Sequence, residues 1–380
     1  MRIVGIAALA LSGIACADGR VVEPAPRRPI ANEAVLIANV GPVVASHEGT
    51  WNVELAATAD ALPRVALTVG SHGTSIVYAA RRGGRVERVR RGVAGWWSPE
   101  QLIDGVSTRV SFDLQSDVGP TWELIGDDDA AVVAPLLAGG PASMWAQRLT
   151  PGSRPERVLV GSARAHAVTY APGGAPHACM STSKHPALSH ATRGRQGWST
   201  TVIGDESERC AIVVAADGTL VVVSADIARV DVVVRSSDQV WRRSSISTGL
   251  SFAAVDVATR ANDTVIAFSD NRRITLARRQ VDGTWTQTVL VPDAGGLVSV
   301  VSLALDTSGL ARVAYAFAHD TGEPEIELAL ASELTSKPST VIRQAKTRFE
   351  SLSLVLDGQN LPHIAYAAGH GGVFHATLAR

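Results

Sequence analysis

The chain has 380 residues, of which 46% are hydrophobic, and its 35 Lys and Arg against 36 Asp and Glu give a formal net charge of −1. This balance argues against a nucleic-acid ligand, because contact with a phosphate backbone requires a clustered excess of Lys and Arg. Beyond the N-terminal segment no run of 18 apolar residues occurs, so no spanning helix is expected and a membrane would be reached only through a lipid anchor.

The first segment, MRIVGIAALALSGIACADGR, places one Arg before an apolar run that ends in small residues. This order is typical of a secretory signal peptide, which we assign to residues 1–15. The letters G-I-A-C resemble the cleavage box of bacterial lipoproteins, in which Cys16 would carry the lipid and begin the mature chain. The letters A-C-A also form an A-x-A site, so cleavage before Asp18 with loss of Cys16, or an uncleaved anchor, remain alternatives. Residues 16–45, with EPAPRRPI inside, are expected to form a flexible tether.

From residue 46 onward the sequence repeats. The stretch SLALDTSGLARVAYAF, residues 302–317, is typical of an alternating strand, a tight turn and a second alternating strand. Related stretches have their matching final positions at 78, 135, 180, 224, 268, 315 and 366, spaced 44 to 57 residues apart. A second motif, matched between 86–102 and 274–290, adds a third strand and a fourth. In four units the fourth strand opens on a tryptophan: Trp97, Trp198, Trp241 and Trp285.

Four strands per unit, seven times over, predict an all-β fold: a seven-bladed β-propeller of four-stranded antiparallel blades over residues 46–380. Each small sheet has two apolar faces that only its neighbours can cover. The last unit stops after its third strand, VFHATLAR, so we expect GTWNVEL, residues 49–55, to supply the missing strand and close the ring without an exposed edge. An open β-solenoid, a two-sheet sandwich or another number of blades are the alternatives.

The unit, roughly L-A-L-D-x-x-G-x-P-H-I-A-Y followed by h-x-h-A-x-R and G-x-W, resembles the repeat of exported bacterial propellers related loosely to the sialidase and Asp-box superfamily. The resemblance covers about residues 46–380 and implies the fold without an activity. Sialidases of this kind require a Tyr nucleophile with a Glu partner. Here Tyr78, Tyr315 and Tyr366 occupy one apolar repeat position and are interpreted as packing residues.

No catalytic motif stands out elsewhere in the chain. It has no G-x-S-x-G elbow, no phosphate-cradling glycine loop and no H-E-x-x-H, so we expect no catalytic residue, no cofactor and no metal site. The histidines pair by repeat position: His177 with His363, and His190 with His375. Repetition at one structural position favours packing or blade-to-blade hydrogen bonds.

Two cysteines follow the expected leader, Cys179 in the third unit and Cys210 in the fourth. By repeat alignment they lie at similar heights in neighbouring blades. A disulfide, which export would permit, and two buried free thiols are the two expectations.

Propellers resembling this one bind ligands on the face that carries the loops between second and third strands. Here those loops include STSKHP, SDNRR, AHDTGEPE and AGHGG, and units five to seven place Asp, Arg and His on one rim. Such a rim suits a polar or anionic ligand, a glycan or a peptide, and the alternative is a solvated loop surface. The candidate residues are Lys184, His185, Asp270, Arg272, Arg273, His319, Asp320 and His370.

The sequence therefore predicts a non-catalytic binding or scaffold module of the bacterial cell envelope, expected to be a monomer. It would be a lipoprotein of the outer membrane or cell surface, or otherwise a periplasmic or secreted protein. The alternative is a carbohydrate-active enzyme, a lyase or glycoside hydrolase, with its site on the same loop face.

Overall fold

The computed structural model describes residues 45–46, 49–57, 61–69, 75–81, 85–91, 97–103, 111–112, 121–124, 130–137, 143–148, 156–160, 163–171, 174–182, 184–248, 254–319, 325–335, 337–345, 349–368 and 372–378. All of these residues belong to one compact unit, Ala38–Arg380. The expected signal peptide, Cys16 and nearly all of the expected tether lie outside the described residues.

The described strands form seven antiparallel sheets, which we number as blades in chain order. Blade 1 holds β3 (Ala61–Val69), β4 (Ser75–Arg81), β5 (Arg85–Arg91) and β6 (Trp97–Ile103). Blade 2 holds β7 (Ser111–Phe112), β8 (Thr121–Leu124), β9 (Ala130–Leu137), β10 (Ser143–Arg148) and β11 (Glu156–Val160). Blade 3 holds β12 (Ala163–Tyr170), β13 (Pro176–Thr182), β14 (Ala187–Gly194) and β15 (Gly197–Glu206). Blade 4 holds β16 (Arg209–Val214), β17 (Leu220–Ala225), β18 (Arg229–Arg235) and β19 (Trp241–Thr248).

The remaining three sheets continue the same pattern. Blade 5 holds β20 (Val255–Arg260), β21 (Asp263–Asp270), β22 (Arg273–Arg279) and β23 (Trp285–Val291). Blade 6 holds β24 (Gly296–Leu305), β25 (Ala311–His319), β26 (Glu325–Ser332) and β27 (Ser339–Ala345). Blade 7 holds β28 (Phe349–Leu356), β29 (Pro362–Ala368), β30 (Gly372–Leu378), β2 (Gly49–Ala57) and β1 (Ala45–Ser46).

One strand of each blade, the first in every blade but blade 2, contacts its counterparts in the two neighbouring blades, and these contacts form a closed circuit. The order is β3, β8, β12, β16, β20, β24, β28 and back to β3. Each blade thus packs between the two that precede and follow it in sequence, which is the arrangement of a β-propeller. The seven sheets are consistent with the expected seven blades. Among the described residues there is no helix that could span a membrane.

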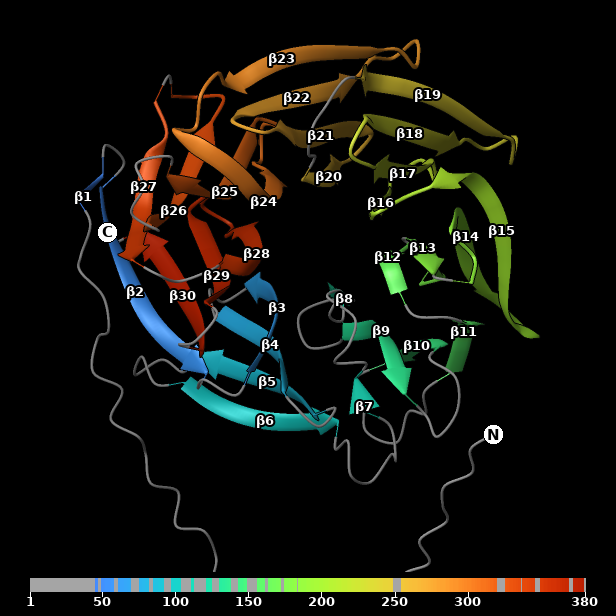
Figure 1. Cartoon of the computed structure of the whole chain (residues 1–380), viewed down its shortest axis with the longest axis horizontal. Helices are drawn as coiled ribbons and strands as arrows, with labels where there is room; N and C mark the ends of the chain where they lie inside the picture. Colours follow the sequence, from blue (N-terminus) through green and yellow to red (C-terminus); the bar gives the residue numbers. More distant parts are fainter. Residues whose placement is uncertain are drawn as a thin grey trace, which may run out of the picture. The chain divides into compact units, whose positions relative to one another are not determined.

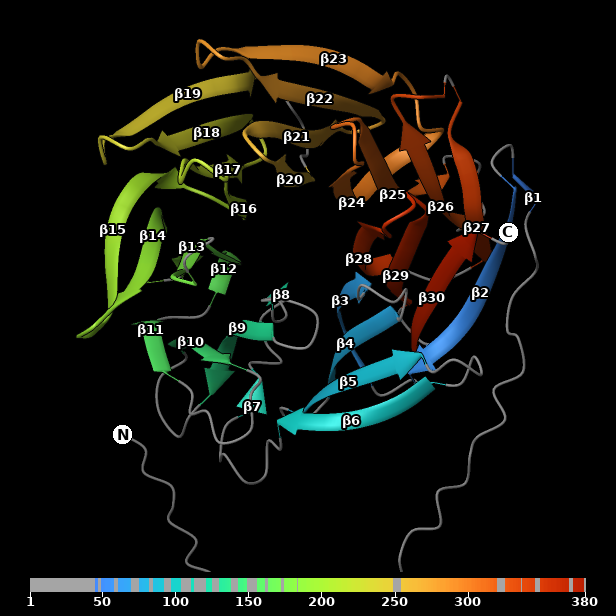
Figure 2. The ribbon, with the colours of Figure 1, turned by 180° about the vertical axis from the view of Figure 1, so that it is seen from behind.

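One blade contains both ends of the described chain. Figure 1 and the view from behind in Figure 2 show β2, in blue, beside β30, in red. The register pairs Trp51 with Leu378 and Glu54 with His375. Trp51 is fully buried, and its indole Nε1 donates to Ser339 Oγ of blade 6 at 3.4 Å. The prediction that residues 49–55 complete the last blade is therefore confirmed, and the pairing extends to Ala57.

Burial follows strand position in blades 3 to 5. Strand β17, LVVVSA, is buried along its whole length because both faces of its sheet are covered by neighbouring blades. The outer strand β15 instead exposes Ser199, Thr200 and Thr201 to solvent. Tyr315 and Tyr366 are buried and stack on Phe317 and Phe374, as expected for packing residues.

A side-chain hydrogen bond that recurs around the ring ties adjacent first strands together. Ser302 Oγ accepts the backbone N–H of Leu354 at 3.0 Å, and Ser353 Oγ accepts that of Leu67 at 3.2 Å. Asp256 occupies the same repeat position in blade 5. Its Oδ2 accepts the N–H of Leu303 at 2.7 Å. These bonds satisfy backbone donors that face the neighbouring blade rather than a strand.

Blade 4 lacks this acceptor, because Ala211 stands at the equivalent position, opposite Val223. The carboxylate of Asp256 compensates: its second oxygen, Oδ1, accepts the N–H of Val257, the next residue of β20, at 2.8 Å. Desolvation outweighs these hydrogen bonds and raises the pKa of Asp256 from 3.8 to about 6.

Candidate functional site

The candidate residues that the structure describes lie in or next to the connections between second and third strands, and they are spread over blades 3, 5 and 6. Lys184 and His185 are exposed between β13 and β14 of blade 3. Asp270 and Arg273 flank the turn between β21 and β22 of blade 5. Asp320 and His370 lie outside the described residues.

Two of the candidates are already engaged by acidic side chains. The exposed Arg272 forms a bidentate ion pair with Asp293, with Nε at 2.8 Å and Nη2 at 3.1 Å from the two carboxylate oxygens. His319 Nε2 lies 3.0 Å from Glu327 Oε2. Arg343 and Thr340 also donate to the carboxylate of Glu327, which is almost completely buried. Arg272 and His319 therefore support local structure.

Asp270 and Arg273 line a cavity at the junction of blades 4 and 5. Its volume is about 150 Å³. Blade 4 contributes Ser247 from its outer strand, and blade 5 contributes Phe268, Thr275 and residues 287–289. Ligand pockets for drug-sized molecules are roughly 300–1,000 Å³, so this one has room for a single sugar ring or one amino-acid residue.

The outer wall of the cavity is fixed in place by a hydrogen bond between blades. Gln287 Nε2 donates to the backbone carbonyl of Ile246, in β19, at 2.5 Å. This bond consumes an amide hydrogen and leaves the Gln287 carbonyl oxygen as an acceptor. Sequence reasoning missed Ser247, Gln287 and Thr288, because they belong to outer strands that carry no motif beyond Trp241 and Trp285.

Equivalent positions in neighbouring blades show what is unusual about Arg273. In each blade the residue at the repeat's final position, on the second strand, pairs with a residue on the third strand. Two places before that third-strand partner stand Arg229 in blade 4, Arg273 in blade 5 and Glu327 in blade 6. The partners that define this position are Ser224 with Asp231, Phe268 with Thr275, and Tyr315 with Ala329.

The charged side chains at these three positions differ in whether an ion pair neutralises them. Arg229 pairs with Asp205 at 2.7 Å and with Asp231 at 3.1 Å. Glu327 is neutralised by Arg343 at 2.8 Å. Within the described part of the chain, the side chains of Arg273 and Asp270 have no hydrogen-bond or ion-pair partner. Both charges line the cavity at the junction of blades 4 and 5, and no described side chain neutralises either.

The repeated histidines pack as their spacing predicted. His177 Nδ1 lies 3.0 Å from His190 Nε2, and the Trp241 ring of the next blade packs on His190. His363 and His375 make the same contact at 3.3 Å, with Trp97 of the next blade against His375. The structural interpretation of these residues is confirmed.

The surroundings of His177 and His190 keep both imidazole rings neutral. Burial, assisted by the charge of Arg235, lowers the pKa of His177 to about 4, and burial lowers that of His190 to about 3. Groups of three or more His, Cys, Asp or Glu suited to a metal ion do not occur among the described residues.

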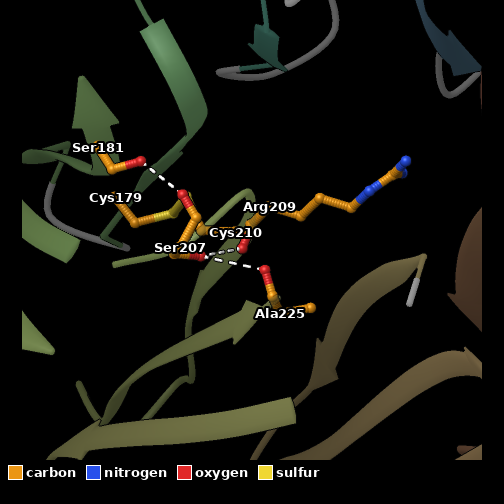
Figure 3. Close-up of a disulfide and its surroundings, with 6 residues drawn as sticks. All are labelled: Cys179, Ser181, Ser207, Arg209, Cys210 and Ala225. Atoms are coloured by element: carbon orange, nitrogen blue, oxygen red, sulfur yellow. Dashed lines mark hydrogen bonds between the residues drawn. A yellow bond between two sulfur atoms is a disulfide. The ribbon is translucent and has the colours of Figure 1, made fainter. Parts of the chain in front are cut away.

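A disulfide joins blade 3 to blade 4. Figure 3 shows Cys179 of β13 bonded to Cys210 of β16, with the Arg209 side chain pointing away from the bond. The two Cα atoms are 6.4 Å apart. Ser181 Oγ donates to the carbonyl of Ser207 at 2.7 Å beside it, so the connection between the two blades is held at two points.

Known proteins share the fold without sharing the sequence. No family model matches the chain, and no curated protein matches it. A catalytically inactive virginiamycin B lyase from Staphylococcus aureus, solved with quinupristin, superposes with a TM-score of 0.55 at 12% identity, over 87% of this chain and 100% of that one. YCF48 bound to D1 peptide gives 0.53 at 14% identity, over 87% and 95%. The lectin BP39L from Burkholderia pseudomallei gives 0.52 at 13% identity, over 83% and 99%. These β-propellers establish the architecture of the chain.

Proposed function

We propose that this protein is an exported, non-catalytic binding propeller whose ligand sits in the cavity between blades 4 and 5. The observation that carries the proposal is the pair Asp270 and Arg273. A charge at the position of Arg273 is neutralised in the blades on either side, whereas here it lines a cavity beside a carboxylate that has no partner among the described residues. Concave sites with a few convergent polar groups are where small ligands bind.

The ligand has to be inferred from this cavity, since one fold serves a lyase, a peptide-bound protein and a lectin. Its lining is mainly polar, with the hydroxyls of Ser247, Thr275 and Thr288 around the two charges. A single residue of a glycan or a peptide matches both the size and the polarity. The proposal therefore covers recognition of one such residue, either free or at the edge of a longer chain.

Export and a lipid anchor at Cys16 complete the proposal. The apolar N-terminal run and the G-I-A-C box support a lipoprotein. The Cys179–Cys210 disulfide supports an oxidising compartment, where such bonds persist. Intact mass of the protein from membrane and soluble fractions tests the anchor: we expect an acylated chain that begins at Cys16, and an unmodified chain that begins at Asp18 would contradict it.

Binding is tested by screening the purified protein against a glycan array and a peptide library. The affinity of each hit is then measured for the Arg273→Ala variant. Arg260→Ala is the matched control. Arg260 is an exposed arginine of the same blade, and it lies at the end of β20 that is remote from the cavity. We expect Arg273→Ala to weaken binding roughly 10-fold or more through loss of a charge-assisted bond, with Arg260→Ala unchanged.

Two results would count against the proposal. Equal binding by the Arg273→Ala and Arg260→Ala variants would place the ligand elsewhere. The glycan or peptide is also analysed by mass spectrometry after incubation with the protein. A product whose formation depends on the protein would favour the carbohydrate-active enzyme or another enzyme instead.

A further inference from the structure

We propose that the cavity between blades 4 and 5 takes an α-amino carboxylate, a group that carries an ammonium and a carboxylate together, as in a free amino acid. The inference rests on the proposed function of this cavity and narrows its ligand to one chemical class.

The two charged side chains start from adjacent points of the blade. Asp270 ends β21 and Arg273 begins β22, and they are directly opposed partners in the antiparallel ladder. Opposed residues have Cβ atoms about 4.5–5.5 Å apart and project to the same face. Both nevertheless line the cavity without forming an ion pair with each other, and within the described residues neither has another partner.

A ligand with a single charge would satisfy only half of this arrangement. A carboxylate alone would pair with Arg273 but would bring a like charge towards the Asp270 carboxylate. An ammonium alone would pair with Asp270 and face the Arg273 guanidinium. An α-amino carboxylate answers both, with the planar guanidinium binding the carboxylate in a bidentate manner and Asp270 accepting from the ammonium.

The rest of the lining fits a short side chain on that ligand. The cavity of about 150 Å³ leaves little space beyond the charged end. Val289 is 48% exposed and supplies an apolar surface. Gln287, held by its bond to Ile246, offers an oxygen that accepts a further hydrogen bond from the ammonium.

The experiment measures binding of three matched probes by isothermal titration calorimetry: DL-alanine, N-acetyl-DL-alanine, which lacks the ammonium, and DL-alaninamide, which lacks the carboxylate. The full chain and its Arg273→Ala, Asp270→Asn and Arg260→Ala variants are each titrated, after circular dichroism and thermal unfolding confirm that they fold. We expect alanine to bind best, and each blocked probe to bind at least 10-fold more weakly.

The variants should reproduce the effect of the blocked probes. Arg273→Ala should lose the preference for alanine over alaninamide, Asp270→Asn should lose the preference over N-acetylalanine, and Arg260→Ala should retain both. Equal binding of all three probes, or no binding of alanine while an array glycan or peptide still binds through Arg273, would overturn this inference and leave the proposed function standing. Failure of every probe, glycan and peptide to bind would overturn both.

Discussion

The disulfide between blades 3 and 4 makes a quantitative prediction about stability. Cys179 and Cys210 are 31 residues apart in sequence, so the bond closes a loop of that size. The loop-closure entropy removed from the unfolded chain corresponds to about 3.7 kcal/mol at 25 °C. We therefore expect loss of the bond to lower the free energy of unfolding by roughly 3–4 kcal/mol.

The test uses denaturant unfolding of Cys179→Ala, Cys210→Ala and the double variant, all in a Cys16→Ser background that leaves no third thiol. Either single change removes the same bond, so the double variant should be hardly less stable than the singles. The strong coupling between the two sites is the signature of the bond. Cys179→Ala should cost somewhat more than Cys210→Ala, because Cys179 is fully buried and its sulfur also packs in the core.

Reductant provides the control. Dithiothreitol should lower the stability of the Cys16→Ser protein by about the same amount and leave the three cysteine variants unchanged. Costs of the two single changes that add in the double variant, or variants that respond to reductant, would refute the reasoning that the bond acts by constraining the unfolded chain.

Two further changes test the ring itself. Alanine at Gly296 would place a Cβ 1.8 Å from the carbonyl oxygen of Ala318, so Gly296→Ala should cost roughly 3 kcal/mol or more. Gly194→Ala, which meets nothing within 4 Å, should change stability by about 0.5 kcal/mol or less, and a similar cost for both in thermal unfolding would contradict the geometry. Between pH 3.8 and 6 the folded state retains a proton on Asp256 that the unfolded state releases, so stability should fall with rising pH by up to about 3 kcal/mol. Denaturant unfolding of Asp256→Asn across that window should show a flatter profile, and an unchanged slope would show that another group is responsible.

Most of the fold could be predicted from the repeat, because the sequence signals of the repeat are local. Alternation within strands, a tight turn and a Trp at the start of the fourth strand recur in most units and require no knowledge of distant residues. The strand at residues 49–55 was predictable because Trp51 matched that motif and the last unit lacked a fourth strand. The histidine pairs followed from equal positions in different units.

The site was less predictable because it depends on which charges find partners. Sequence alone ranked Arg272 and Arg273 equally, yet Asp293, 21 residues from Arg272, neutralises only the first. His319 was a candidate until the register of β25 and β26 placed Glu327 beside it. An unpaired charge is a property of the assembled junction, and no local pattern records it.

The pairing of β2 with β30, which closes the ring, also determines the order in which parts of the chain fold. Trp51 enters the chain early, but its ladder partner Leu378 stands near the other end. Until the last blade exists, β2 has no sheet to join, and its tryptophan has no finished surface to pack against. Blades 3 to 6 each consist of consecutive strands and can form from neighbouring segments, whereas the final step is a contact between remote ends, which is slow to find by diffusion. The ring should therefore lock late and all at once, and a chain shortened at either end would remain an open arc of blades.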